Sequence, residues 1–523
     1  MNSVLPSTNV NEDLSAQLLD KVQQQAGTIA RVLAEQGDCS VNEYVQQLGP
    51  SEHSSYQPVS DVADLLLDYV TPLLGREIAQ TARDELMAQP LVLTANHHGV
   101  DFFAQSVQGT LLLSQRELRL EGVTRRARIV PVFACGSVAM NNLTYPRGAL
   151  LYGADDEQVP LRLPIFPDRV KRQLVARTAP FDQGMLDRAI ARVHKLAGEG
   201  RITSTTQNSM CSILTEHYGA REVLTQKSYS DQAVMLNARL WREMMPPEFD
   251  SELVYLELEQ IGARLLQQDL GNEQSLISIL LFNRTVRAEL MTLLNGAKGC
   301  WVGADLLTQA LDGQPLSGFG TFMFWGVDSK GRRISLGVDS NSGIDVLRAV
   351  DSSAAFEPVP LTPESITEAM NQGHLLPSLF CCYTAISLAR GVVCAGGYYQ
   401  AEYLPVMQQG VVSALRSHGS YSDIVAKVER VKTNCYLSGM QMVMANDSQA
   451  GLVPAGPVEI IAGGGLSMAE LKQLGQLSVR LAHIASLSET VPDVVPDQIL
   501  SASQLTRLAR EIARRQKDSL IVK

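Results

Sequence analysis

The segment that most constrains the fold is an apolar run followed by a polar turn, a helix and a second apolar run. Residues 90–94 (PLVLT) predict a buried strand, residues 95–99 (ANHHG) a turn, and residues 101–118 (DFFAQSVQGTLLLSQREL) a helix. Residues 127–136 (ARIVPVFACG) predict a second buried strand. A strand, a helix and a strand in this order form a βαβ unit, and such units build parallel sheets. We therefore expect an α/β fold around a parallel sheet.

Breaks in the hydrophobic pattern divide the chain into three parts. Residues 1–60 predict an N-terminal helical appendage, residues 61–412 a catalytic core, and residues 413–523 a small C-terminal α+β region. Within the core, residues 181–300 predict a helical insertion, in which Val254, Leu258, Ile261 and Leu265 fall on one face of a helix.

Local signals add several elements to this outline. Apolar runs on either side of Lys330-Gly331 predict a hairpin, and Thr362-Pro363-Glu364 predicts the start of a helix. Residues 391–395 (GVVCA) predict another buried strand. Ser467 and Glu470 form a capping box shortly after three glycines, Gly463–Gly465. The glycines could let a phosphate approach the backbone closely, and the alternative is a glycine turn without a ligand.

Composition excludes several classes of function. The 523 residues carry a formal net charge of −11, and a surface that is acidic on average repels nucleic-acid backbones and anionic membranes. No apolar run is long enough to span a bilayer, and the N-terminus lacks the pattern of a signal peptide. The eight cysteines form no CxxC pair, so we expect reduced thiols and no metal centre. These features favour a cytoplasmic protein that acts on small molecules and leave a homodimer open.

The first group of candidate site residues lies in the turn after the first predicted strand. A ligand binds beyond the carboxyl ends of parallel strands, and a helix N-terminus there attracts phosphate. We expect His97 and His98 to stabilise charge during catalysis. The neighbouring candidates are Thr94, Asn96 and Gly99 for a cofactor and Asp101 for a substrate. The alternative interpretation is a solvated loop in which the histidines only cap the helix.

The second group follows the strand predicted at residues 391–395. Two glycines, Gly396 and Gly397, permit a tight turn against a ligand, and Glu402 could bind an amine, hold magnesium or act as a base. The remaining candidates for substrate binding are Tyr398, Gln400, Tyr403 and, after the predicted hairpin turn, Arg333. The alternatives are a glycine turn with a solvated glutamate and a solvated end of a strand.

Taken in order, these motifs make the chain resemble the cysteine-adding enzymes of bacillithiol synthesis. Those enzymes open a Rossmann core with a strand and a TGQQxGxxxGP turn, where this chain has TANHHGVDFFAQ, and Thr94 and Gly99 match. The shared order continues through residues 130–133 (VPVF), 331–333 (GRR) and 361–364 (LTPE) to the glycine pair with Glu402 and Tyr403. The two histidines depart from the family, and NHHG is similar to the HxGH turn with which nucleotidylyltransferases and class I synthetases bind ATP.

The resemblance implies a Rossmann-like core of the nucleotidylyltransferase or synthetase type. It also implies an ATP-dependent ligase of the class that forms carbon–nitrogen bonds. The ligase would join an amino acid, for which cysteine is the leading candidate, to a small amine or hydroxyl acceptor. ATP, with magnesium as its accompanying ion, would bind at the helix after Gly99. Two alternatives stay open: an acyltransferase that needs no ATP and uses His97 or His98 as a base, and a synthetase-like protein that binds a partner without catalysis.

Overall fold

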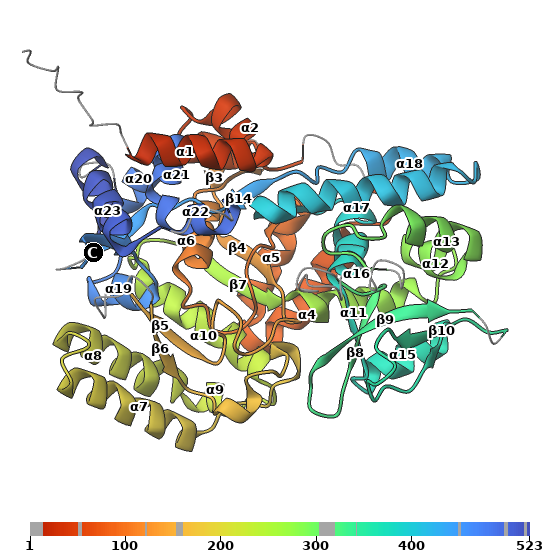
Figure 1. Cartoon of the computed structure of the whole chain (residues 1–523), viewed down its shortest axis with the longest axis horizontal. Helices are drawn as coiled ribbons and strands as arrows, with labels where there is room; N and C mark the ends of the chain where they lie inside the picture. Colours follow the sequence, from red (N-terminus) through yellow and green to blue (C-terminus); the bar gives the residue numbers. More distant parts are fainter. Residues whose placement is uncertain are drawn as a thin grey trace, which may run out of the picture.

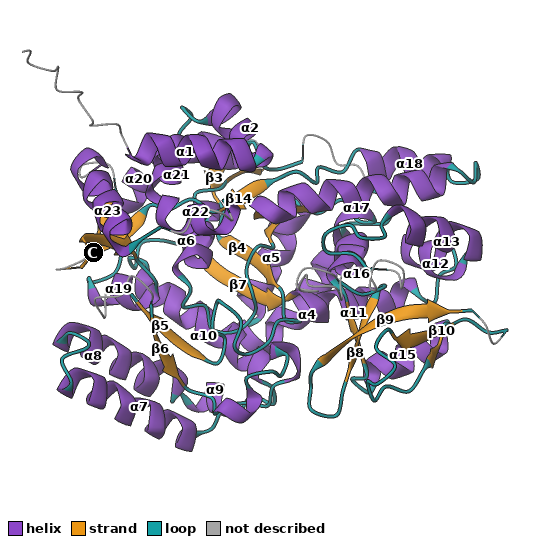
Figure 2. Ribbon diagram, viewed as in Figure 1, coloured by secondary structure: helices purple, strands orange, loops and turns teal. Residues whose placement is uncertain are grey.

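The fold is mixed α/β and is built on a parallel sheet. The structure is a computed structural model that describes residues 14–50, 55–120, 123–152, 160–302, 320–340, 343–447, 451–495, 500–516 and 520–523. In the sheet the strands follow the order β14 (Tyr436–Ser438), β13 (Val393–Gly397), β1 (Leu91–Leu93), β4 (Ile129–Ala134) and β7 (Glu252–Glu257). All four neighbouring pairs are parallel. The predicted parallel sheet is thus confirmed (Figure 2).

The strand order places β1 at the centre of the sheet. Along the chain β1 is followed by β4 and β7 on one side, and the chain then returns to the other side of β1 to add β13 and β14. The order of these five strands across the sheet is therefore 3-2-1-4-5 when they are counted along the chain. Such a reversal between β1 and β13 leaves a crevice at the carboxyl ends of the two strands, where ligands of parallel sheets bind.

Helices cover both faces of the parallel sheet, because alternate strand residues point into two hydrophobic cores. Leu91, Leu93 and Val132 belong to one core, and Val92 and Phe133 belong to the other. The first core is completed by α2 (Gly27–Gln36), α6 (Ala104–Leu113) and α10 (Tyr229–Met244). The second is completed by α4 (Ser60–Leu74), α5 (Arg76–Ala88), α11 (Leu258–Asp269) and α17 (Tyr398–Arg416).

The smaller sheets are attached around this core. An antiparallel sheet has the order β11 (Val359–Pro360), β10 (Val346–Ala349), β9 (Arg333–Asp339), β8 (Phe324–Val327) and β12 (Leu375–Pro377). The C-terminal sheet has the order β16 (Gly451–Pro454), β15 (Val443–Asp447) and β17 (Ile521–Val522). Two hairpins join β2 (Glu117–Leu120) to β3 (Val123–Arg126) and β5 (Gly148–Leu151) to β6 (Leu161–Pro164).

The remaining helices surround these sheets (Figure 1). In the first half of the chain they are α1 (Leu14–Gln25), α3 (Val41–Gln46), α7 (Gln183–Gly198), α8 (Ser204–Ser212) and α9 (Arg221–Leu224). Next come α12 (Leu276–Phe282), α13 (Arg284–Leu293), α15 (Pro363–Asn371), α16 (Leu379–Tyr383) and α18 (Ser422–Glu429). The C-terminal region adds α19 (Pro457–Ala462), α20 (Met468–Gln476), α21 (Val479–Ala485), α22 (Leu487–Val494) and α23 (Ala502–Gln516).

Two secondary-structure expectations were wrong. Val254 lies in strand β7 at the edge of the parallel sheet, and the helix predicted there begins only at Leu258. The helix predicted over residues 101–118 is limited to α6, because the chain enters the hairpin β2–β3 at Glu117. The predicted helix start at Pro363 and the capping box of Ser467 and Glu470 are confirmed.

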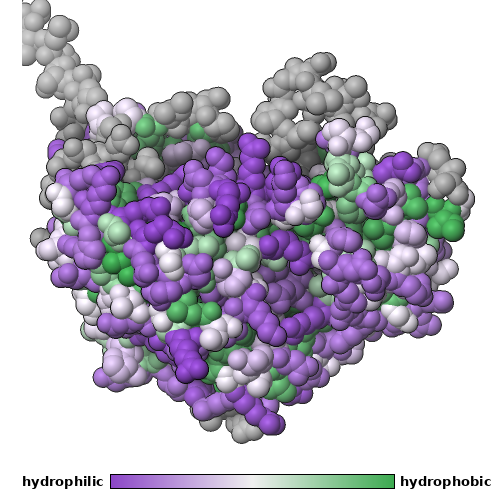
Figure 3. Space-filling view, turned by 90° about the horizontal axis from the view of Figure 1, so that it is seen from below, coloured by the Kyte–Doolittle hydropathy of each residue, from purple (hydrophilic) through white to green (hydrophobic). Residues whose placement is uncertain are grey.

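Hydrophilic side chains dominate the surface seen in Figure 3, where apolar side chains form small, separate groups. Isolated apolar side chains are ordinary on a protein surface and need no partner to explain them. Among the residues that the structure describes, no helix combines the length and the apolar character that a membrane span requires.

Candidate functional site

A cavity of about 270 Å³ lies at the carboxyl ends of β1 and β13, where the strand order reverses. Its size is near the lower end of the range for small-molecule sites. Seven of the residues predicted from the sequence line it: Thr94, Asn96, His97, Gly397, Tyr398, Gln400 and Tyr403. The structure therefore brings most of both predicted groups together, although about 300 residues separate them in the chain.

One wall of the cavity is the start of α17. This helix is 19 residues long and begins directly after the glycine pair that ends β13. Its N-cap is Gly397, which has no side chain to accept a bond from the first amides of the helix. The cavity is thus faced by a helix N-terminus that attracts negative charge.

The glycine pair serves two different purposes at this wall. A Cβ atom on Gly396 would lie 2.4 Å from the side chain of Gln400, so Gly396 makes room for that side chain. A Cβ atom on Gly397 would meet nothing closer than the carbonyl oxygen of Ser438, at 3.7 Å. Gly397 is therefore the glycine that leaves open space for a ligand at the helix N-terminus.

A buried polar network joins this wall to β1. The Gln400 amide donates to Thr94 Oγ1 at 2.6 Å and accepts from the Tyr383 hydroxyl at 3.0 Å. The Tyr383 and Tyr403 hydroxyls lie 3.5 Å apart, and burial raises the pKa of Tyr403 above its usual range. These phenols stay neutral and act as hydrogen-bonding groups at neutral pH. Thr94 and Gln400 thus hold β1 and α17 in a fixed relation at the cavity.

The opposite wall is the turn after β1, and His97 is its principal polar group. His97 Nδ1 lies 2.8 Å from Asn142 Oδ1, in the loop between β4 and β5. Burial and the nearby Arg333 guanidinium lower the pKa of His97, so its imidazole is neutral at neutral pH. Arg333 itself packs over the Trp325 ring and donates to the carbonyl oxygen of Ser137, and it does not line the cavity.

His98 has a different environment and does not line the cavity. Its ring is fully buried, stacks on Tyr255 and places Nε2 2.8 Å from Ser230 Oγ. Burial lowers the pKa of His98 to about 4, so the ring is neutral in the folded protein. The surroundings of His98 are those of a packed core residue.

Gly99 and Asp101 also lie away from the cavity. Gly99 has a φ of +128°, and a Cβ atom there would lie 2.9 Å from Pro146, so packing requires this glycine. Asp101 accepts a hydrogen bond from Asn96 at 3.1 Å, and burial raises its pKa to about 7. Asp101 thus orients the amide of Asn96 from behind the wall of the cavity.

The helix after Gly99 does not offer the expected phosphate site. The amide of Ala104, at the start of α6, donates to the Tyr152 hydroxyl at 2.9 Å, and the amide of Phe103 donates to Asp101 at 3.2 Å. Of this helix, only Gln105 lines the cavity. The helix N-terminus that faces the cavity is that of α17.

Glu402 does not line the cavity either. It is an exposed residue of α17, and its charge acts on Lys298, whose ammonium group packs over the Tyr399 ring. Gln400 and Tyr403 lie on the face of the helix that is turned toward the cavity. The side-chain direction rotates by about 100° around the helix axis from one residue to the next, so Glu402 points away from that face.

Several residues of the cavity were not found from the sequence. Tyr383 and Tyr436 line it, as does Asp493 of α22, and Ile29 of α2 brings in the N-terminal region. None of them belongs to a motif, and all are brought in by the fold from distant parts of the chain. Only their position beside predicted strands or helices could have drawn attention to them.

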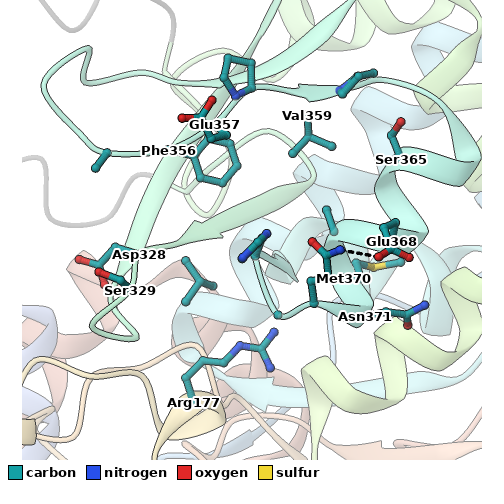
Figure 4. A pocket seen from close by; sticks show the side chains of 18 of the residues that line it. Arg177, Asp328, Ser329, Phe356, Glu357, Val359, Ser365, Glu368, Met370 and Asn371 are labelled. Atoms are coloured by element: carbon teal, nitrogen blue, oxygen red, sulfur yellow. Dashed lines mark hydrogen bonds between the residues drawn. The ribbon is translucent and has the colours of Figure 1, made fainter.

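A second, larger hollow of about 1040 Å³ lies between the β8–β9 turn and α15. Figure 4 shows Arg177 on one side of it, Asp328 at the turn, and Glu357 and Glu368 on the far walls. Most of its polar side chains are exposed, and none of the residues predicted from the sequence lines it. The cavity between β1 and β13 is therefore the stronger candidate for a reaction site.

Neither cavity resembles a metal centre. Among the described residues, no group of three or more histidine, cysteine, aspartate or glutamate side chains is placed to hold a metal ion. The eight cysteines are free, and six of them are buried.

Comparisons with known proteins do not assign the chain to a family. No protein-family model, no curated protein and no solved structure matches it.

Proposed function

We propose that this protein is an ATP-dependent ligase that joins an amino acid to a small amine or hydroxyl acceptor. The observation that carries the proposal is the cavity between β1 and β13, which is faced by the N-terminus of α17. The 3-2-1-4-5 order of the parallel strands supports the proposal, because in Rossmann-like sheets the phosphates of a nucleotide lie on a helix N-terminus beside the switch point. We include in the proposal a core of the nucleotidylyltransferase or synthetase type.

In this proposal the ATP phosphates lie at the Gly397 end of α17. The amides at the start of that helix would donate to the phosphate oxygens, and Gly397 lets them approach the backbone. A magnesium ion would be held chiefly by the phosphates and water, because protein ligands for magnesium are usually few. Tyr383, Tyr403 and Gln400 would position the amino acid.

The direct test is the release of ADP or pyrophosphate from ATP. The full chain is incubated with magnesium and ATP, and each common amino acid is added in turn, beginning with cysteine. We expect one amino acid to stimulate release and to be recovered in a covalent product when an amine or hydroxyl acceptor is present. If no amino acid stimulated release above the background, the proposal would be wrong.

A second candidate is an acyltransferase that takes an acyl group from a preformed thioester without ATP. The observation that favours it is the neutral His97 imidazole on the cavity wall, which suits a general base. Acyl transfer that continues after ATP has been removed with apyrase would support this candidate over the ligase.

A further inference from the structure

The turn after β1 carries proton acceptors, whereas the uncapped start of α17 carries backbone amides, which are donors. This difference begins with Asn142, whose Oδ1 atom accepts from the backbone amide of Thr144 at 3.2 Å. Because a backbone amide can only donate, this atom of Asn142 is its oxygen, and an amide oxygen cannot donate to His97. The 2.8 Å contact with His97 therefore requires a proton on His97 Nδ1.

The other ring nitrogen of His97 then carries a lone pair. In a neutral imidazole only one nitrogen is protonated, so Nε2 is an acceptor when Nδ1 is a donor. Within the described part of the chain, Nε2 of His97 has no hydrogen-bond partner, in contrast to Nε2 of His98, which is bonded to Ser230. The acceptor of His97 is thus available to a ligand in the cavity.

Asn96, in the same turn, carries a second acceptor, which is buried and unpartnered among the described residues. It is 1% exposed and lines the cavity, and its Nδ2 group donates to Asp101 at 3.1 Å. The acceptor is its Oδ1 atom. A carboxylate has no proton to give at neutral pH and a phosphate is largely deprotonated, whereas an amine or a hydroxyl always carries one.

We infer that the β1 wall is the subsite for the nucleophile, an amine or hydroxyl group, that His97 Nε2 takes its proton, and that Asn142 is the positioning residue that sets this tautomer. The inference rests on the proposed function and assigns the two walls of its site. It also changes the expected role of His97 from stabilising phosphate charge to accepting a proton. In this assignment, phosphate groups bind to the backbone amides at the start of α17.

The proposed step transfers the acyl group from a phosphate oxygen to the nucleophile. The lone pair on the nucleophile's nitrogen or oxygen forms a bond to the acyl carbon, and the bond from that carbon to the phosphate oxygen breaks. The leaving phosphate or adenylate takes the electron pair, and the N–H or O–H proton of the nucleophile moves to His97 Nε2. The resulting imidazolium passes its proton to water before the next turnover.

The groups around His97 fit this use of a neutral base. Arg333 of β9 is the charged group that acts on the ring, and it opposes the imidazolium form. Cys135, at the end of β4, has a thiol that hydrogen-bonds to Glu259 and whose pKa is raised by burial. The Tyr255 hydroxyl donates to the His97 carbonyl oxygen, and Asp101 lies beyond it.

The tautomer can be tested without substrate by nitrogen NMR of the full chain labelled in its eight histidines. The His97 signals are assigned by their loss in His97→Asn. We expect a protonated Nδ1 and an unprotonated Nε2 in the wild type and in Asn141→Ala, a control at the exposed neighbouring asparagine. In Asn142→Ala we expect the Nε2-protonated form to appear. A wild-type His97 with its proton on Nε2 would overturn the inference.

The role of the base is tested by the pH dependence of kcat/KM for whichever transfer the protein catalyses. Asn142→Asp keeps an acceptor at Nδ1 and adds a negative charge, so the acid limb of the profile should move up by about one pH unit or more. Asn141→Ala should leave the profile unchanged, and His97→Asn should lower kcat about 10²–10⁴-fold. An unmoved profile in Asn142→Asp, with the expected tautomer in the NMR experiment, would overturn the base assignment, whether or not ATP is consumed.

Discussion

His97 and His98 are neighbours in the chain, yet their rings have opposite surroundings. His97 lies on the wall of the cavity with one nitrogen bonded to Asn142, and His98 is fully buried against Tyr255 and Ser230. Adjacent residues of an extended turn point in different directions, so a pair of histidines rarely acts on one ligand. The two positions should therefore respond to mutation in different ways.

His98→Leu should lower stability and leave the chemistry intact. The substitution removes the hydrogen bond to Ser230 Oγ inside the core, which typically costs about 1–3 kcal/mol when a partner is left unsatisfied. Urea unfolding measures the loss, and turnover per folded molecule should stay within a few-fold of the wild type. A large loss of turnover in a fully folded His98→Leu protein would place His98 in the reaction instead.

Several residues predicted from the sequence line the candidate cavity, but their hydrogen-bond partners there could not be predicted. A strand followed by a polar turn or by two glycines was enough to predict Asn96, His97 and Gln400 as site residues, because parallel strands end at a common edge. Asn142 could not be predicted, because its loop reaches His97 from 45 residues away without a motif. Glu402 was predicted with the same group but does not line the cavity, and the direction in which it points follows only from where α17 begins.

At the scale of the elements, one buried carboxylate accepts three hydrogen bonds from the loop after β4. Glu259, at the start of α11, accepts from the amides of Gly136 and Ser137 at 2.6 and 2.9 Å and from the Cys135 thiol. In the same loop, the Ser137 carbonyl oxygen accepts a hydrogen bond from Arg333 of β9. Glu259 therefore links the parallel sheet to the antiparallel sheet close to the cavity.

Glu259→Gln should loosen this loop. The neutral amide keeps one acceptor oxygen and places an NH₂ group against the amide donors, so we expect a loss of about 1–3 kcal/mol in the free energy of unfolding. Hydrogen exchange should become faster at Gly136 and Ser137 and stay unchanged in α23, which lies at the other end of the chain. Equal exchange rates at the two amides in both proteins would contradict this role for Glu259.

Strand β7 was predicted as part of a helix. Residues 253–256 (LVYL) form a continuous apolar run, and from Leu258 onward apolar side chains recur at helical spacing. Strand β7 passes into α11 without a glycine or proline, so one continuous pattern covers both and the helical period was extended too far. Strands β1, β4 and β13 were predicted, because turn residues separate each of them from the next element, whereas the three-residue strand β14 was not.

At the scale of the whole molecule, the two ends of the chain share one hydrophobic core. Val22 and Leu33 of the first helices are buried together with Leu487 of α22 and Leu508 of α23, and the red and blue helices lie side by side in Figure 1. Ile29 of α2 and Asp493 of α22 also line the cavity. The N-terminal helices therefore contribute to both the core and the candidate site.

The buried histidines His98 and His483 make the free energy of unfolding depend on pH, and His483 lies in the core that the two ends of the chain share. Burial lowers the pKa of His483 to about 3, and its ring stacks on Tyr436 of β14 with 1% exposure. An unfolded histidine takes up a proton below a pH of about 6.5, so between that pH and 3 the unfolded state binds more protons than the folded state. This contribution to stability is complete above pH 6.5 and is lost as the pH falls.

His483→Phe should reduce this loss, because phenylalanine keeps a ring against Tyr436 and has no proton to gain. Between pH 7 and pH 5 the wild type should lose about 2 kcal/mol of its free energy of unfolding through His483, and the variant should retain this amount. The figure follows from about 1.4 kcal/mol per pH unit for each proton that the unfolded state binds in excess. Urea unfolding of both proteins at the two pH values measures the difference. His98 remains in both proteins, so only the part due to His483 should disappear; equal losses in the two proteins would contradict the assignment.

The central claim is that the cavity at the N-terminus of α17 binds the phosphates of ATP, and calorimetric titration with magnesium-ATP tests it most directly. Gly397→Asp places a favoured N-cap residue at the helix start, so the fold should be kept while its carboxylate occupies the amides and repels phosphate. Gly397→Asn provides a neutral cap of the same shape. We predict that the wild type binds, that Gly397→Asp binds at least about tenfold more weakly than Gly397→Asn, and that its melting temperature does not fall. A wild type that does not bind ATP, or a Gly397→Asp variant that binds it as tightly as the wild type, would contradict the account.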